Sequence, residues 1–242
     1  FLLNFNDMKT KNLSIFLTVL LIACSDVDDN PKPDRTQFEI LLEKAQQNDA
    51  EAQYNLGRMY HYGEDVPRDF ATAKAWYEKA AAQGQLDAQV NLGVIYNNGS
   101  GVPQNFNTAK AWYEKAAAQG HAEAQYNLGT MYYYGGGVPQ NFATAKAWYE
   151  KAAAQGDIRS QNNLGFMYTQ GQGGHKDFNT AKFWYEKAAA QEDTDAQYNL
   201  GLIYLNGRGI GKDLNTAKKW FKQSCDNGNQ QGCDEYRILN PH

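Results

Sequence analysis

The sequence predicts an all-α solenoid, a stack of helix pairs, and three observations support this class. The five tryptophans of the 242-residue chain lie at 76, 112, 148, 184 and 220, so every interval between them is 36 residues. Each interval contains two helical patterns separated by a glycine-rich turn. The chain is 42% hydrophobic, which is enough to form a core. A fixed period of this length indicates a repeat array rather than a single compact enzyme core.

The first 35 residues do not share the chemistry of the repeat. Residues 1–7 precede the first methionine, Met8, and we interpret them as sequence upstream of the true start. A short basic stretch then precedes an apolar run over residues 13–23. This run is shorter than the roughly 20 residues that span a bilayer, so residues 1–24 are interpreted as upstream residues plus a signal peptide. Residues 25–35 are polar and contain two prolines, and they predict a flexible tether.

The apolar run ends in Leu-Ile-Ala-Cys, which resembles a bacterial lipobox whose cysteine is Cys24. The resemblance implies that Cys24 becomes the lipidated first residue of an exported chain. Because Ser25 rather than aspartate follows it, the resemblance favours the outer membrane, on the periplasmic side. This lipid would be the chain's one attachment to a membrane. An ordinary secretory signal with a chance cysteine is the alternative interpretation.

Alignment on the tryptophans divides residues 49–228 into five copies of one unit. In copy one the first helix is expected over residues 50–62, ending at Gly63 in a left-handed C-cap. The second helix is expected to begin after Asp69, a good N-cap residue. Neither helix is long enough to be stable alone, so each must pack against its neighbours. Capping helices are expected over 36–48 and 229–242. The copies are 49–84, 85–120, 121–156, 157–192 and 193–228.

Two motifs, A-x-Q-x-N-L-G and K-A-W-Y-E-K-A-A-A-Q-G, recur at this period, and together they resemble the Sel1-like repeat, a relative of the tetratricopeptide repeat. The resemblance covers all five copies. It implies an α/α solenoid that serves mainly as a scaffold for protein–protein contacts. In related solenoids the first helix of each repeat lines the concave groove.

Comparison of the five copies separates a constant face of the first helix from a variable one. The variable face carries tyrosine, phenylalanine and aliphatic residues mixed with asparagine and threonine, where a solvated face would carry lysine and glutamate. We therefore expect it to line a groove for a protein partner. Packing between repeats is the alternative for Val94, Phe166 and Leu202, and the constant tryptophans are expected in the core. The expected groove residues are Tyr54, Arg58, Val94, Tyr126, Tyr133, Tyr134, Phe166, Tyr198 and Leu202.

Cys225 and Cys233 lie eight residues apart, on consecutive helices near the turn between them. This spacing resembles the cysteine pairs of the Helicobacter cysteine-rich proteins, a Sel1-like family whose helices are linked by disulfides. The resemblance implies a Cys225–Cys233 disulfide, which an exported chain would keep in an oxidising compartment. Zinc binding is the alternative, although no histidine or further cysteine stands nearby.

Some cysteine-rich relatives have been linked to penicillin binding and β-lactam hydrolysis, so the alternative function is β-lactam or peptidoglycan processing or binding. The sequence has no S-x-x-K, G-x-S-x-G or H-E-x-x-H motif. We therefore expect no catalytic residue, no metal site and no cofactor, and the net charge of −4 gives no indication of nucleic-acid binding. The expected function is a non-catalytic, monomeric scaffold of the bacterial cell envelope that binds an unidentified protein or peptide partner. Carbohydrate binding by stacking on the groove tyrosines is a third hypothesis.

Copy four departs from the pattern at two places. Gly174-His175 replace the Val-Pro of the turn in copy one, and Glu192 stands where copies one, two, three and five have glycine. A left-handed backbone is expected at this glycine position, so Glu192 should cost roughly 1 kcal/mol. Copy four is therefore the expected place for a change of superhelix pitch or a hinge.

Overall fold

The computed structural model describes residues 36–241, and over this range the chain consists of helices joined by turns, without strands. The predicted signal peptide, the predicted lipidation site Cys24 and the predicted tether lie outside the described residues. The helices are α2 (Gln37–Gln46), α3 (Ala50–Tyr62), α4 (Phe70–Ala82), α5 (Leu86–Asn98), α6 (Phe106–Ala117), α7 (Ala122–Tyr134), α8 (Phe142–Ala154), α9 (Ile158–Gln170), α10 (Phe178–Ala189), α11 (Thr194–Asn206), α12 (Leu214–Asp226) and α13 (Gln230–Leu239).

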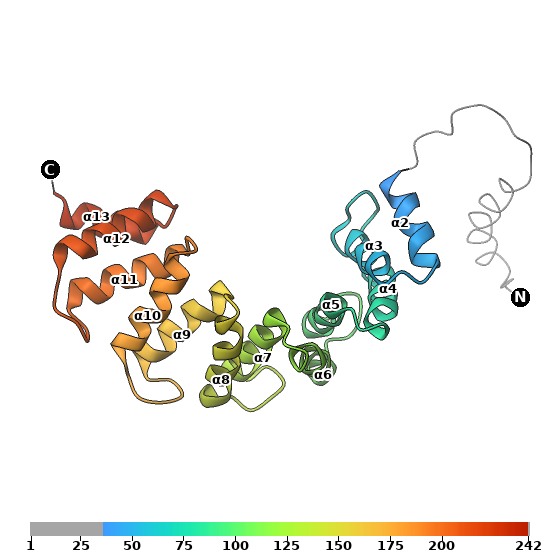
Figure 1. Cartoon of the computed structure of the whole chain (residues 1–242), viewed down its shortest axis with the longest axis horizontal. Coiled ribbons are helices and arrows are strands. Elements are labelled where there is room, and N and C mark those ends of the chain that lie inside the picture. Colours follow the sequence, from blue (N-terminus) through green and yellow to red (C-terminus); the bar gives the residue numbers. More distant parts are fainter. Residues whose placement is uncertain (1–35, 242) are drawn as a thin grey trace, which may run out of the picture. The chain divides into compact units, whose positions relative to one another are not determined.

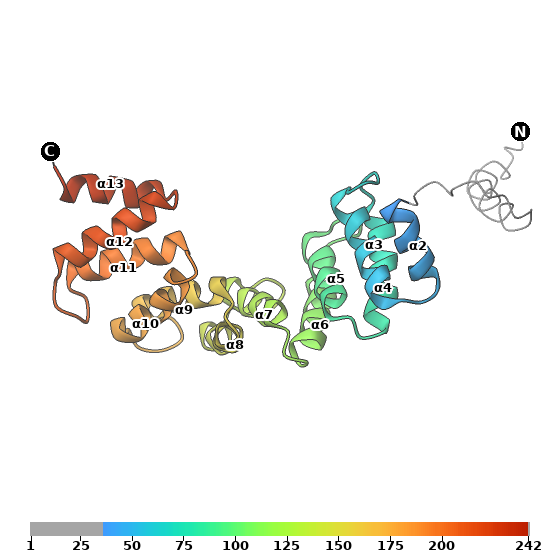
Figure 2. The same ribbon diagram turned by 45° about the horizontal axis from the view of Figure 1, so that its top comes forward.

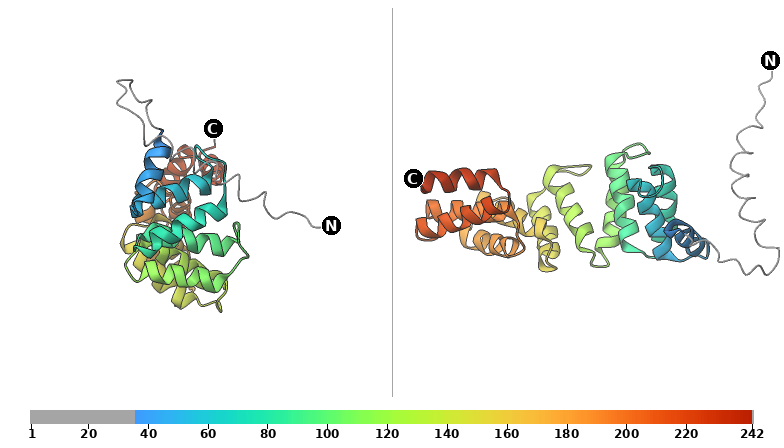
Figure 3. Two further views of the ribbon diagram at one scale, coloured as in Figure 1. Left: turned by 90° about the vertical axis from the view of Figure 1, so that its right-hand side faces the viewer. Right: turned by 90° about the horizontal axis from the view of Figure 1, so that it is seen from above.

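The helices from α3 to α12 form five consecutive pairs, which confirms the predicted all-α solenoid. The first helices of the pairs are α3, α5, α7, α9 and α11, and each packs on the second helix that follows it (Figures 1 and 2). From α5 onward, each first helix also packs on the second helix of the repeat before it. Figure 3 shows the same succession of pairs from two other sides. Contacts also join α3 to α5 and α9 to α11, so the first helices lie side by side at these two junctions.

Side-chain caps begin the helices, and glycines end the first helix of each pair, both as predicted. Each second helix begins after an aspartate or asparagine that accepts hydrogen bonds from backbone N–H groups of the first turn. Each first helix ends at a glycine with φ between 65° and 78°, a conformation that costs other residues strain. The N-caps are Asp69, Asn105, Asn141, Asp177 and Asp213, and the glycines are Gly63, Gly99, Gly135, Gly171 and Gly207.

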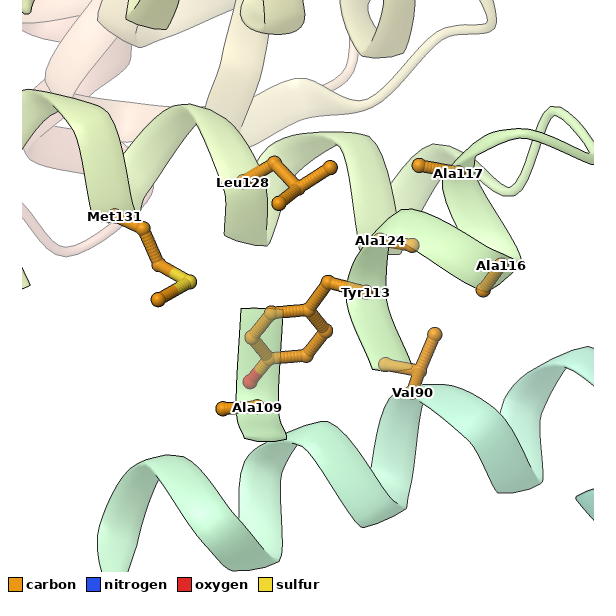
Figure 4. Packing of buried hydrophobic residues seen from close by; sticks show 8 residues of the cluster. All are labelled: Val90, Ala109, Tyr113, Ala116, Ala117, Ala124, Leu128 and Met131. Atoms are coloured by element: carbon orange, nitrogen blue, oxygen red, sulfur yellow. The ribbon is translucent and has the colours of Figure 1, made fainter. Parts of the chain in front are cut away.

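The tightest contact in each repeat joins a glycine of the first helix to an aromatic ring of the second. A Cβ added to Gly129 would lie 2.6 Å from the Tyr149 ring, which is closer than real Cβ contacts. Tyr149 itself is almost fully buried. Figure 4 shows the equivalent Tyr113 ring among buried side chains of neighbouring helices. The equivalent pairs are Gly57–Tyr77, Gly93–Tyr113, Gly165–Tyr185 and Gly201–Phe221.

The tryptophans lie at the edge of the core rather than inside it, which corrects the expectation. All five are partly buried, and each packs against a cluster formed between its own repeat and the element before it. Trp112 of α6, for example, packs against the cluster that contains Tyr77 and Leu92. The Lys79 ammonium lies 4.1 Å from the centre of the Trp76 ring, on its outer side. The tryptophans therefore join repeats, while the residue after each tryptophan fills the core.

Buried glutamines also connect successive helices, through hydrogen bonds. Gln161 donates from Nε2 to the Ala153 carbonyl of the preceding repeat at 3.2 Å, and its Oε1 accepts from Gln191 at 2.9 Å. Gln53 and Gln125 have the same two kinds of partner. Repeat two differs, because Gln119 donates instead to the Lys115 carbonyl of the preceding helix, and Gln89 Oε1 is buried without a partner. This acceptor lacks a bond that the other repeats make.

Glu192 has φ of 66°, so the predicted left-handed glutamate is present. The counterpart Gly156 has φ of 96°, and no atom lies within 4 Å of the place its Cβ would take. The cost at Glu192 is therefore conformational rather than steric, roughly 1 kcal/mol. The expected change of pitch or hinge at this repeat stays a prediction.

We predict that Gly129→Ala destabilises the protein by about 1–3 kcal/mol, because the new methyl group must displace the buried Tyr149 ring. Chemical denaturation measures the loss. Gly136→Ala is the matched control in the same repeat, since its Cβ would meet no atom within 4 Å and its φ is not positive. Equal stability of the two variants would contradict the importance of the ring contact.

We also predict that the aspartate-capped second helices fray in acid while the asparagine-capped ones do not. The hydrogen bond from Thr72 to Asp69, 2.7 Å long, lowers the pKa of the Asp69 carboxyl below its usual 3.8, and Asp177 and Asp213 are lowered by the same kind of bond. A lowered folded-state pKa means that the stabilisation is present above pH 3.8 and is lost as the pH falls through the folded value.

Hydrogen exchange at the first turns of the second helices, compared at pH 5 and pH 2.5 after correction for intrinsic rates, checks this prediction. Protection should fall at the N-termini of α4, α10 and α12. It should be kept at α6 and α8, whose asparagine caps do not titrate. Equal loss of protection in both groups would show that the caps are not responsible.

Candidate protein-interaction groove

The nine predicted groove residues all lie on first helices, and the structure divides them into a partly buried group and an exposed group. Tyr54, Tyr126 and Tyr198 are partly buried, and each ring lies on the core aromatic of its own repeat. The ring centres are 6.0 Å apart for Tyr54–Tyr77, 5.8 Å for Tyr126–Tyr149 and 5.8 Å for Tyr198–Phe221. These tyrosines form the floor of the groove, because one side of each ring already packs on the core.

Three aliphatic or basic members of the predicted set are also partly buried. Val94 packs against the cluster that contains Leu128, so the alternative role between repeats applies to it. Leu202 is partly buried on α11. Arg58 lies on α3 with its guanidinium 4.0 Å from the Glu64 carboxylate, and the two side chains are 43% and 55% exposed. A pair this exposed contributes little to stability.

Two predicted residues project into solvent. Tyr134, the last residue of α7, is 74% exposed, and Phe166 of α9 is 43% exposed. They line a pocket of about 250 Å³ together with Tyr133, Tyr149 and Asn163. Residues from α7, α8 and α9 therefore meet at this point. Three of the predicted groove residues, Tyr133, Tyr134 and Phe166, lie together at this one pocket.

Tyr133 contacts residues on several sides of this pocket. Its hydroxyl donates a hydrogen bond to Gln172 Oε1 at 3.1 Å, in the turn of the next repeat. Its ring meets the rings of Tyr134 and Phe142 edge to face, with centres 4.8 Å and 5.3 Å apart. The Tyr149 hydroxyl lies 3.2 Å from Thr130 Oγ1. The hydroxyls of Tyr133 and Tyr149 are thus already hydrogen-bonded within the protein.

The tyrosines of the groove floor are neutral, and the cation beside them is paired. Burial raises the pKa of Tyr54 and that of Tyr149, so both phenols are neutral in the physiological range. The Arg159 guanidinium lies 4.0 Å from the centre of the Tyr126 ring and also bonds Asp157 at 3.0 Å. The Arg159 guanidinium therefore already interacts with a ring and a carboxylate of the protein itself.

The sequence analysis left two exposed aromatic residues out of the expected groove. Tyr62 is 57% exposed and occupies in repeat one the position of Tyr134 in repeat three, so the repeat frame contained the signal for it. Phe183, 49% exposed on the second helix α10, could have been found by comparing the residues at its position in the five copies. Copies one to three carry alanine at that position and copy five carries Lys219, which makes the phenylalanine conspicuous.

Cys225 and Cys233 form a disulfide between α12 and α13, as the resemblance to the cysteine-rich proteins implied, and their Cα atoms are 4.5 Å apart. Within residues 36–241 no three potential metal-binding side chains gather at one place. In the same range no helix has the length and apolarity that a membrane crossing requires.

Comparison with known proteins is consistent with this architecture. The family model described as the Sel1 repeat matches residues 50–85, 86–121, 122–157, 158–193 and 194–229, one residue later than the boundaries derived from the tryptophans. No curated protein matches the chain.

Two solved structures are similar in both sequence and fold. A protective antigen of uropathogenic Escherichia coli strains, with an SLR fold, is 36% identical with a TM-score of 0.81. The match covers 85% of this chain but 44% of the antigen, so the chain spans less than half of that protein. A Sel1 repeat protein from Oxalobacter formigenes is 35% identical with a TM-score of 0.76, covering 81% of this chain and 80% of that one. Cysteine-rich protein B of Helicobacter pylori matches more weakly, at 25% identity, a TM-score of 0.42, and 52% of this chain against 96% of that one.

The nearest-neighbour packing of the helix pairs defines a helical-repeat protein. The chain belongs to the Sel1-repeat family, whose members generally act as scaffolds for protein–protein interaction.

We predict that removing the disulfide loosens the C-terminal end of the array alone. The double variant Cys225→Ser with Cys233→Ser should lose about 2–3 kcal/mol of local stability, since the bond constrains the unfolded chain near α13. Hydrogen exchange should show faster opening of α13. The helix at the other end, α2, is the internal control, and equal acceleration there would contradict a local role.

Proposed function

We propose that this protein is a non-catalytic scaffold of the bacterial cell envelope that binds a protein or peptide partner along its first helices. The observation that carries the proposal is the composition of that face. Tyr62, Tyr134 and Phe166 expose aromatic rings to solvent, and partly buried tyrosines form a floor beneath them. Exposed aromatic residues on a rigid framework are typical of the residues that dominate interface energetics.

Site-specific photocrosslinking in intact cells tests which face binds. The photoreactive residue p-benzoylphenylalanine is placed at Tyr62, Tyr134 or Phe166 on the first helices. Ala111 and Ala147, which are exposed on the second helices, are the matched control positions. We expect the first-helix positions to capture one common partner and the control positions to leave it uncaptured. Equal capture from both sets of positions would contradict the proposed groove.

The envelope location rests on the lipobox resemblance at Cys24. In the proposal Cys24 carries the lipid, the chain is attached to the outer membrane on its periplasmic side, and the array is a monomer. Cell fractionation and mass spectrometry of wild type and Cys24→Ala test this. The wild type should enter the membrane fraction with the mass of added acyl chains, and the variant should not. A soluble wild type of unmodified mass would overturn the lipid anchor.

The non-catalytic part of the proposal is tested against the β-lactam alternative. Turnover of the chromogenic β-lactam nitrocefin by purified protein would contradict it, since a scaffold requires no activated nucleophile. Phe166→Ala controls for contamination, because an activity of the groove should change with this variant and a contaminating activity should not.

A further inference from the structure

We propose that the pocket lined by Tyr133, Tyr134, Tyr149, Asn163 and Phe166, here called the anchor pocket, binds one uncharged aromatic side chain of the partner. This inference rests on the proposed function and adds to it the place and the chemistry of the main contact. Four of the five lining residues are aromatic, and they come from three consecutive helices.

The size of the anchor pocket favours a single side chain. Its volume is about 250 Å³. Pockets that enclose a drug-sized ligand measure roughly 300–1,000 Å³. The anchor pocket is therefore too small to enclose a ligand of several rings, and it is large enough for one residue of an extended peptide whose neighbours continue along the groove.

The charges around the anchor pocket favour a neutral group. Within α7 and α9 the only acidic or basic side chains are Glu123 and Arg159, both in the first turn of their helices. Tyr133, Tyr134 and Phe166 lie in the second halves of these helices.

On α8, which also lines the pocket, the ammonium groups of Lys146 and Lys151 lie 3.8 Å and 4.0 Å from the ring centres of Tyr168 and Trp148. Glu150 of α8 accepts a hydrogen bond from the Tyr168 hydroxyl. A charged group in the pocket would lose water without gaining a counter-ion, which is costly.

The polar atoms of the anchor pocket favour an aromatic ring over a saccharide. The Tyr133 hydroxyl is bonded to Gln172, and the Tyr149 hydroxyl lies beside Thr130. A sugar ring would bring several hydroxyl groups that need partners, and few are free here. The exposed rings of Tyr134 and Phe166 offer apolar faces and edges instead. The lining rings already meet edge to face, which is a geometry that a further aromatic ring can extend.

The repeat frame shows why the anchor pocket lies at this junction. The positions of Tyr134 and Phe166 recur in adjacent repeats as Tyr62 with Val94, Asn98 with Thr130, and Gln170 with Leu202. Among these four junctions, that of repeats three and four alone carries two aromatic residues. Phe183 of α10 is the matched control for Phe166, because it is the same residue type, 49% against 43% exposed, on a second helix outside the pocket lining.

The test uses blocked amino acids as probes of the purified protein, followed by ¹⁵N NMR. N-acetyl-tryptophanamide should shift the backbone amide signals of residues 133, 134 and 166 in a saturable manner. Phe166→Ala should weaken its binding at least fivefold, and Phe183→Ala should leave it unchanged. Because both side chains are exposed, the variants should fold, and matching spectra elsewhere in the protein verify this.

N-acetyl-lysinamide and methyl glucoside are the competing probes. Tighter binding of either one at the same signals would overturn the inference, as would the absence of any shift with the tryptophan probe at its solubility limit. The photocrosslinked partner separates this failure from failure of the groove. If the partner still binds a Tyr134→Ala/Phe166→Ala variant with unchanged affinity, the anchor pocket is wrong while the groove stands. If the partner is captured from the second helices instead, the proposed function itself fails.

Discussion

The packing of an aromatic ring on a glycine determines how closely the two helices of each repeat approach, and the rest of the structure depends on this contact. The ring occupies the space where a Cβ would stand, as Tyr149 does over Gly129. The same ring then contacts a tyrosine of the groove, as Tyr149 contacts Tyr126 and Tyr77 contacts Tyr54. The candidate site is thus built directly on the core, so its floor has the rigidity of the core.

The junction between each first helix and the second helix before it depends on a second set of contacts, which are polar. The buried glutamine of each first helix satisfies a carbonyl at the end of the preceding second helix, such as that of Ala153. Carbonyls at helix ends need partners of this kind. The tryptophans add an apolar contact across the same joints. Repeats are therefore held both by burial and by directional bonds, which restricts how one repeat can rotate on the next.

Local features of the fold could be predicted from the sequence, whereas the depth of each side chain could not. The helix over Ala50–Tyr62, the N-cap Asp69 and the strained Glu192 follow from short-range chemistry, and the structure contains all three. The tryptophans were expected in the core because they do not vary, yet the aromatic residue that follows each tryptophan is the one that is buried. Tyr126 and Tyr134 have the same side chain on the same helix, yet Tyr126 packs on the Tyr149 ring and is partly buried, whereas Tyr134 at the helix end is 74% exposed. Comparison of copies distinguishes constant from variable positions, but constancy does not measure exposure.

Each repeat packs mainly within its own helix pair, and its main contacts with other repeats are with the adjacent ones. A gene segment that encodes 36 residues could therefore be duplicated in frame, and the new unit would meet its neighbours with the same glycines, rings and glutamines already in place. Deletion of one unit would leave an equally complementary joint. Arrays of different length can then arise by the gain or loss of single units, each of which brings its own complementary surfaces.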